Sequence, residues 1–277
     1  MSSNNYPAAP PSYTAPAAPK DYQAVPQHDT PAPSYGAAET SSTPRNVDEE
    51  GDPDDFKFGV TVEQSSPEIR AMFLRKVYTV LFFQILGSTV IAAIMTTQNI
   101  ASWVQQNQWA FIVPMIGSLV TMGFLYFKRH SHPTNIILLS LFTVLESISL
   151  GTVITYVDQK IVLQAMIITA FTFFGLTLFT LQSKWDFGSM GGWLFGALMV
   201  MVGVGFVGVF LPYNQTFDLI MAIAGCVVFS LYIVYDTWLI QRRLSAEEWV
   251  LANISLYLDI VNLFISILRI LNNQSRD

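Results

Sequence analysis

The sequence predicts an all-α, polytopic membrane protein with seven transmembrane helices, of which the last either crosses the bilayer or re-enters it. Composition is the first reason: of 277 residues, 52% are hydrophobic and only 12% are charged, where a soluble domain has about 25% charged residues. The second reason is a series of seven apolar stretches after Met72. Each has about 20 residues, enough to cross a ~30 Å hydrocarbon core.

Residues 1–55 differ from the rest of the chain. They hold ten of the 14 prolines, nine acidic residues and only Lys20 and Arg45 as basic ones. Their net charge is −7, so the remaining residues carry +1 of the overall −6, and no basic surface for nucleic acid is indicated. Such a segment cannot bury enough apolar surface to fold, so we expect a disordered cytosolic tail followed by a seven-helix domain over 56–277.

One short motif lies in this tail. Pro10-Pro11-Ser12-Tyr13 is a PPxY sequence, which a polyproline conformation can present to the aromatic groove of a WW domain. A ubiquitin ligase with WW domains is the partner that this motif predicts. The alternative is that the segment acts only as a solvated tether.

The seven apolar stretches follow one another with short loops between them. The last one, "LANISLYLDIVNLFISIL", contains more polar groups than the others, which leaves the re-entrant alternative open. The predicted spans are 72–95, 109–127, 135–156, 161–181, 191–211, 217–240 and 250–271.

Basic residues predict the orientation of these spans. Nine Lys and Arg residues lie on the side of the N-terminus and the loops after the second, fourth and sixth spans, whereas the opposite loops contain only Lys160. Basic loops stay in the cytosol. We therefore expect a cytosolic N-terminus and, with seven full spans, a C-terminus on the other side.

Polar residues inside the spans form a pattern of their own. Ser255, Asp259, Asn262 and Ser266 lie at i, i+4, i+7 and i+11 of the last span, which is one continuous stripe on a helix. In the sixth span, Asp236 interrupts "FSLYIVYDTWLIQRR", where a lone charge costs about 3 kcal/mol. Antiparallel neighbours would bring Asp236 and Asp259 to similar depths in the cytosolic half.

Two further charged residues are candidates for the same region. Glu146 lies in the middle of the third span and serves either the pore lining or helix packing. Arg129 lies at the cytosolic end of the second span. It can act as a counter-charge for an aspartate or as an anchor at the lipid headgroups. Gly188, Gly192 and Gly196 repeat every four residues, which predicts close helix packing.

The sequence also excludes several chemistries. All three histidines lie outside the spans, so no intramembrane Ser-His hydrolase or histidine metal site is predicted. No nucleotide-binding loop occurs. We therefore predict that the protein is not an enzyme and has no cofactor.

Three stretches carry a family resemblance: "HPTNIILLSLFTVLESISLG", "YDTWLIQRR" and "LYLDIVNLFISILRIL". They resemble the transmembrane Bax inhibitor motif family, nearest its lifeguard branch, over about residues 60–272. The resemblance implies a central helix surrounded by the other six, and a pH-sensitive calcium leak channel that restrains cell death. The membrane implied is intracellular: endoplasmic reticulum first, with vacuole, Golgi or mitochondrion as alternatives.

The resemblance also implies roles for particular residues. It makes Asp236 and Asp259 the pH-sensing pair, Arg129 the arginine that pairs with one of them, and Glu146 and Asn262 candidate pore-lining residues. Many relatives have Gln where Trp238 stands, so a role for that amide does not carry over. Cell-death regulators are implied as partners, beside the lipid bilayer and calcium ions.

A physical argument gives the aspartate pair a mechanism. Two carboxylates about 4 Å apart repel by roughly 4 kcal/mol at an effective dielectric constant near 20, so Asp236 and Asp259 are expected to share one proton and titrate as a unit. Once both are ionised they must separate or recruit a cation, either Arg129 or a transient Ca²⁺.

Two other functional classes are compatible with the same residues. A non-conducting scaffold that binds cell-death regulators is the main alternative. An intramembrane aspartyl protease also needs two aspartates, but Asp259 follows Leu256-Tyr257-Leu258 rather than Gly-x-Gly.

The predicted topology can be tested by protease protection of tags in sealed microsomes. The basic asymmetry predicts that a tag at the N-terminus is digested and a tag at the C-terminus is protected. A protected N-terminal tag would contradict the orientation, and a digested C-terminal tag would favour a re-entrant last segment.

Overall fold

A computed structural model describes residues 61–208, 210, 212 and 214–275, all of which fall within the unit Gly51–Asp277. The predicted tail 1–55, with its Pro10-Pro11-Ser12-Tyr13 motif, lies outside the described residues, so the boundary at residue 56 stays a prediction. The described part contains helices and no strand. Its elements are η2 (Val62–Gln64), α1 (Pro67–Met95), α2 (Gln98–Gln106), α3 (Trp109–Lys128), α4 (Thr134–Ile154), α5 (Gln159–Gln182), α6 (Met190–Gly208), α7 (Gln215–Arg242), η3 (Ala246–Glu248) and α8 (Trp249–Gln274).

Seven of these helices, α1 and α3 to α8, are long and apolar enough to cross a membrane. Each coincides with one predicted span, which confirms the polytopic, all-α class. The last segment forms one uninterrupted helix of 26 residues, about 39 Å long at 1.5 Å per residue. This length favours a full crossing over the re-entrant alternative.

The short helix α2 was not predicted. It lies within the expected loop 96–108. Its sequence "QNIASWVQQ" is too short and too polar to cross a bilayer, so it did not stand out as a span. Val104 is its buried residue, and Gln105 Nε2 donates a hydrogen bond to the carbonyl of Thr155 at 2.7 Å. The helix thus ties the α1–α3 connection to the end of α4.

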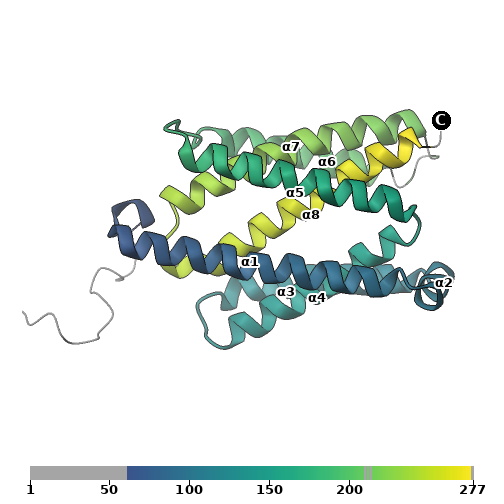
Figure 1. Ribbon diagram of the computed structural model, residues 1–277, viewed down its shortest axis with the longest axis horizontal. Coiled ribbons are helices and arrows are strands. Elements are labelled where there is room, and N and C mark those ends of the chain that lie inside the picture. The colour runs from purple at the N-terminus through teal and green to yellow at the C-terminus, as the bar shows by residue number, and fades with distance from the viewer. Residues whose placement is uncertain (1–60, 209, 211, 213, 276–277) are drawn as a thin grey trace, which may run out of the picture. The chain divides into compact units, whose positions relative to one another are not determined.

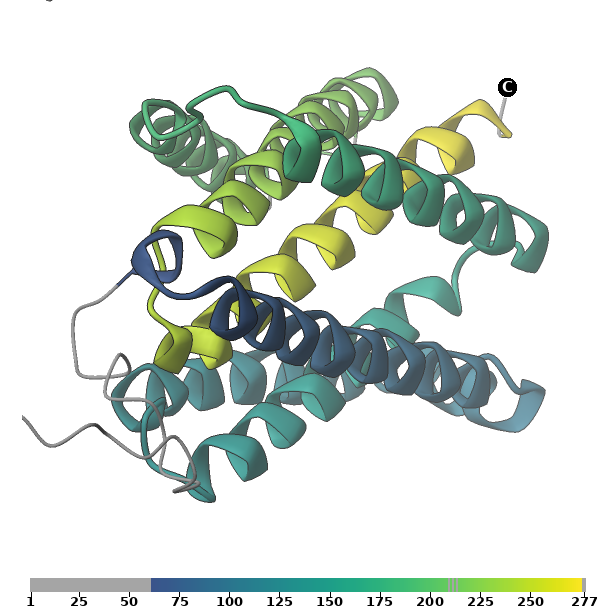
Figure 2. The same cartoon turned by 60° about the vertical axis from the view of Figure 1, so that its left-hand side comes forward.

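The bundle is arranged around α8 (Figure 1). Helices α1, α3 and α4 lie on one side of α8 and α5, α6 and α7 on the other, and α8 packs against α1, α4, α5 and α7. In α8, 61% of the most apolar 18-residue stretch is buried, against 6% in α6. The central helix implied by the family resemblance is therefore α8, and its polar sequence reflects a protein environment rather than a lipid one (Figure 2).

Local signals in the sequence explain where the helices begin. Ser66 caps α1, whose first residue is Pro67, the position in which proline costs no hydrogen bond. Asn214 caps α7 by accepting a hydrogen bond from the Phe217 amide at 3.0 Å. Between α7 and α8, Ser245 and Glu248 form a capping box, so the connection that sets the register of these two helices is itself ordered.

Glycine permits the close approach of α7 and α8 at one point. A Cβ atom on Gly225 would collide with Ser266 Oγ and would lie 3.3 Å from Met201 Cε. The predicted close packing is confirmed at Gly188, where a Cβ would lie 2.8 Å from a side-chain atom of Trp238. It is wrong at Gly192 and Gly196, because nothing lies within 4 Å of a Cβ at either position. Both belong to α6, the helix with the least burial.

A larger residue at Gly225 is expected to destabilise the protein. Gly225→Leu forces α7 away from Ser266 and should cost about 1–3 kcal/mol, as overpacking usually does. Gly175→Leu is the matched control, because open space surrounds Gly175 in the middle of α5. Thermal unfolding in detergent should show the loss for Gly225→Leu alone. Equal melting temperatures of the two variants would contradict this packing.

Candidate functional site at the interface of α7 and α8

The predicted polar stripe of α8 follows the interface with α7. Asp259 meets Asp236, Ser266 meets Gly225, and Arg269, one turn further along α8, meets Asp218. The residue numbers rise along α8 as they fall along α7, as expected for antiparallel neighbours. The stripe is thus one polar seam between two helices, with an acidic residue of α7 near each end.

The aspartate pair lies at the end of the seam that faces the α7–α8 connection. Both side chains are nearly inaccessible, with 9% of Asp236 and 6% of Asp259 exposed. The two carboxyl groups lie within hydrogen-bonding reach of each other, and the Ser255 side chain lies in hydrogen-bonding position to Asp236. A hydrogen bond between the two carboxyl groups requires a proton on one of them. The two aspartates that the sequence pattern predicted to be neighbours thus lie side by side in the structure.

Further groups surround the pair without neutralising it. Tyr232, one turn before Asp236, lies close enough to interact electrostatically with both aspartates. Asp259 Oδ2 is buried and has no hydrogen-bond partner among the described residues. Neither aspartate forms an ion pair with a Lys or Arg of the described chain. The unpaired oxygen is a vacant acceptor for a proton, a water molecule or a cation.

Arg129 does not occupy the predicted position beside an aspartate. It follows the last residue of α3, where Nη2 lies 3.9 Å from Glu248 Oε1 and Nε donates a hydrogen bond to His130 Nε2 at 3.0 Å. Helix α3 packs mainly on α4, which holds Arg129 outside the α7–α8 seam. Its partner comes instead from the ordered connection before α8.

The predicted pore-lining residues have different surroundings. Asn262 lies on the stripe, but its Nδ2 donates to the carbonyl of Leu258 one turn earlier at 2.8 Å. Glu146 is half-buried on α4 and acts electrostatically on Tyr257 of α8. It therefore lies on the side of α8 that faces α1 and α4, away from the seam.

A buried hydroxyl cluster on that side was not predicted. Ser88 of α1 hydrogen-bonds to Tyr257 at 2.8 Å, and the Ser147 hydroxyl of α4 donates to Ser88 Oγ at 2.8 Å. One turn away, Gln84 Nε2 donates to Thr143 Oγ1 at 2.8 Å. The four-residue spacing of Gln84 with Ser88 and of Thr143 with Ser147 was the available signal.

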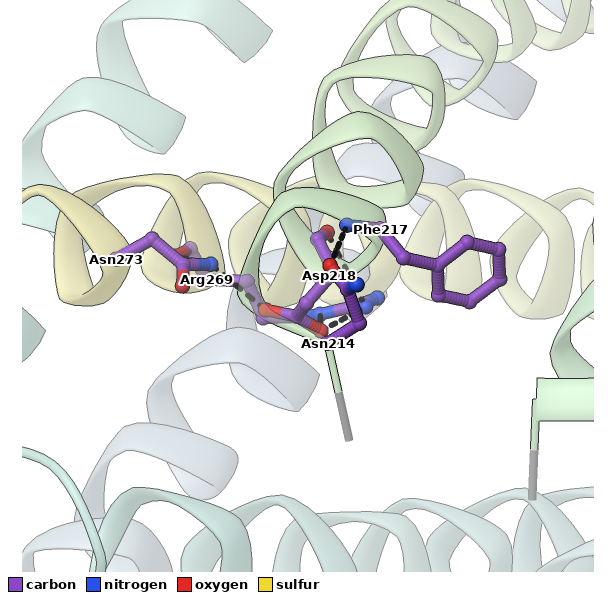
Figure 3. Close-up of polar contacts among 5 residues, drawn as sticks. All are labelled: Asn214, Phe217, Asp218, Arg269 and Asn273. Atoms are coloured by element: carbon purple, nitrogen blue, oxygen red, sulfur yellow. Dashed lines mark hydrogen bonds and ion pairs between the residues drawn. The ribbon is translucent and has the colours of Figure 1, made fainter. Parts of the chain in front are cut away.

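An ion-pair cluster at the other end of the seam was also missed (Figure 3). Asp218 Oδ1 accepts hydrogen bonds from Arg269 Nε, at 3.0 Å, and from Arg269 Nη2, while Asp218 Oδ2 accepts one from Asn273 Nδ2 at 2.7 Å. This cluster joins the first turn of α7 to the last turns of α8.

The described chain offers no preformed metal site, since no three His, Cys, Asp or Glu side chains in it gather around a common point. Calcium prefers six to eight oxygen ligands, and the aspartate pair supplies only part of such a set.

Comparison with known proteins identifies the family. The model of the family "Inhibitor of apoptosis-promoting Bax1" matches residues 70–276, which include every predicted span and leave out only residues 67–69 of α1. The chain belongs to this Bax inhibitor family. The aspartate pair and the whole seam fall within the matched region.

Named relatives of this Bax inhibitor family member come from distant organisms. Protein lifeguard 4 of Mus musculus is 42% identical over 79% of this chain and 92% of its own length. Bax inhibitor 1 of Schizosaccharomyces pombe is 39% identical over 91% and 96%, respectively. The Golgi anti-apoptotic protein of vaccinia virus, strain Lister, is 41% identical over 80% and 94%. The similarity spans nearly the full length of each relative.

The ion pair at the far end of the seam should contribute measurably to stability. Arg269→Ala leaves Asp218 without its cation, and because both side chains are partly exposed we expect a loss of about 1–2 kcal/mol. Lys160→Ala, at the same end of the bundle, is the control. Thermal unfolding of both variants tests this, with Asp218→Arg/Arg269→Asp expected to recover part of the loss. No difference between the two single variants would show that the cluster is dispensable.

Proposed function

We propose that the protein is a pH-sensitive calcium leak channel of an intracellular membrane, and that it restrains cell death. The observation that carries the proposal is the close approach of two buried carboxyl groups, those of Asp236 and Asp259, in a seam that runs between two spans. Intramembrane carboxyl groups are expensive and mark ion or proton pathways by default. A pair without a fixed cation suits a conducting site better than a purely structural one.

The electrostatics of the pair supply the pH dependence. With one proton between them the carboxyl groups hold α7 and α8 together. When that proton leaves, two negative charges at about 4 Å repel by roughly 4 kcal/mol at an effective dielectric constant near 20. The charges must then separate or take up a cation, and Asp259 Oδ2 is available to Ca²⁺. Proton loss therefore couples helix separation to cation entry.

The position of Arg129 modifies the gate expected from the sequence. Because Arg129 pairs with Glu248 at the start of α8, it does not neutralise an aspartate in this state. We propose that the shared proton alone holds the gate closed, and that Arg129 anchors the connection before α8. The ionised pair then has no basic side chain of its own and is open to a permeant cation such as Ca²⁺.

The names of relatives support the cellular role. One is a Golgi anti-apoptotic protein and another a Bax inhibitor, so an intracellular membrane and a function against cell death are the natural proposal for this chain. The N-terminus is proposed to face the cytosol, on the basis of its basic flanks. Pro10-Pro11-Ser12-Tyr13 would then be accessible to a cytosolic WW-domain protein.

Calcium flux into proteoliposomes, measured against pH, tests the proposal. Asp236→Asn or Asp259→Asn removes the like-charged neighbour, so the pH midpoint of flux should shift in each single variant. The double Asn variant should lose the pH dependence. Glu68→Gln, an exposed acid in the first turn of α1, is the control and should keep the parental profile.

The outcome distinguishes the functional classes. A double Asn variant with the parent's pH profile would make the aspartates structural and would refute the gate. Absence of flux from the parent, with cell-death restraint retained in cells, would favour the non-conducting scaffold instead.

A further inference from the structure

A cavity lies between α1 and α4, away from the α7–α8 seam. Its volume is about 980 Å³, and it is closed at one end by the α3–α4 loop and by the residues that lead into α8. From Lys76 to Gln84 on α1 and from Asn135 to Val144 on α4, its lining extends two turns into the bundle, about 12 Å. The seam and its aspartates do not contribute to it.

Basic side chains line the mouth of this cavity. Lys76, Arg129, His130 and His132 lie there with one acid, Glu247. The Lys76 ammonium lies 4.3 Å from the centre of the Trp249 ring and has no carboxylate partner among the described residues. Arg129 uses Nε for its hydrogen bond to His130, and its Nη2 lies 3.9 Å from Glu248 Oε1. Both cations therefore retain donors for an anion.

The inner part of the cavity is mainly apolar, with one polar exception. Phe83, Ile136 and Val144 line it and are 63%, 44% and 42% exposed, respectively, so its open side faces the hydrocarbon of the bilayer. At the deep end Gln84 is 94% buried, and its Oε1 has no hydrogen-bond partner in the described chain. The cavity thus offers cations at the headgroup level, apolar walls below them and a free acceptor at depth.

This order of surfaces, with cations at the mouth and apolar walls below them, matches the structure of an anionic phospholipid. A soluble anion would use the basic mouth but not the apolar walls, and a neutral acyl chain would use the walls but not the cations. Pockets for small ligands commonly measure about 300–1,000 Å³, so this one has room for a headgroup and the upper part of its chains. The basic loops lie at the same end of the bundle and attract anionic lipids.

We propose that the α1–α4 cavity binds an anionic phospholipid from the leaflet on the side of the basic loops. The phosphate lies between Lys76 and Arg129, and the acyl chains follow Phe83 and Val144. The site is independent of the aspartate gate, so either proposal can fail without the other.

Lipid binding to the purified full-length chain tests the site. The protein, in phosphatidylcholine nanodiscs, is titrated with phosphatidic acid, and bound lipid is counted by native mass spectrometry. Lys76→Gln should weaken binding about fivefold, the factor that corresponds to about 1 kcal/mol per lysine near a membrane surface. Lys184→Gln is the matched control, since Lys184 is an exposed lysine in the α5–α6 loop that does not line the cavity.

Two further arms separate the remaining explanations. Ser140→Trp places a large side chain at an exposed position of the cavity wall and should abolish binding, whereas glycerol 3-phosphate should not displace the lipid. Equal losses for Lys76→Gln and Lys184→Gln would reduce the effect to general surface charge. Unchanged binding to Ser140→Trp, or displacement by glycerol 3-phosphate, would overturn a lipid site in this cavity.

Discussion

The contact between the carboxyl groups of Asp236 and Asp259 is the interaction on which the arrangement of the bundle depends. In hydrocarbon an ionised carboxylate has no compensation, so each aspartate needs a partner inside the protein. The partner of each is the other, which fixes α7 beside α8 at one register. Once that register is set, Gly225 lies against Ser266 and Asp218 reaches Arg269. Sliding either helix by a turn would leave charged groups at both ends of the seam unpaired.

The same constraint places α8 at the centre. Its seam residues cannot face lipid, and its opposite side carries Tyr257, which needs Ser88 and Ser147 as hydrogen-bond partners. A helix with polar groups on both sides must be surrounded. The outer helices have the reverse character: Phe171 on α5 and Trp193 on α6 are 76% and 85% exposed, as suits side chains that contact lipid.

The sequence predicted those features that depend on one segment at a time. Length and apolarity sufficed for the seven spans, and the period of the α8 stripe with the depth of Asp236 sufficed for the aspartate pair. Features that depend on which helices are neighbours were not accessible. The partner of Arg129 depends on the conformation of the α7–α8 connection, which delivers Glu248 to it.

The hydroxyl cluster and the ion-pair cluster at Asp218 could not be predicted for the same reason. The hydroxyl cluster requires α1, α4 and α8 to meet, and nothing in a single segment says that they do. The partner of Asp218 could not be predicted because it depends on how the first turn of α7 packs against the last turns of α8, which brings Arg269 to it. Packing between segments, not propensity within them, decided these contacts.

The two ends of the seam differ in how their acidic residues are compensated, and this difference assigns them different roles. Asp218 has a guanidinium and an amide as partners, so the protein itself compensates the acidic residue at that end. Asp236 and Asp259 have no such cation in the described chain, and in the proposed gate a shared proton holds them together. A helix pair fixed at one end and held by that proton at the other would open from the aspartate end. Movement at the aspartates would therefore pivot about the Asp218–Arg269 contact, and that contact sets how far the seam can separate.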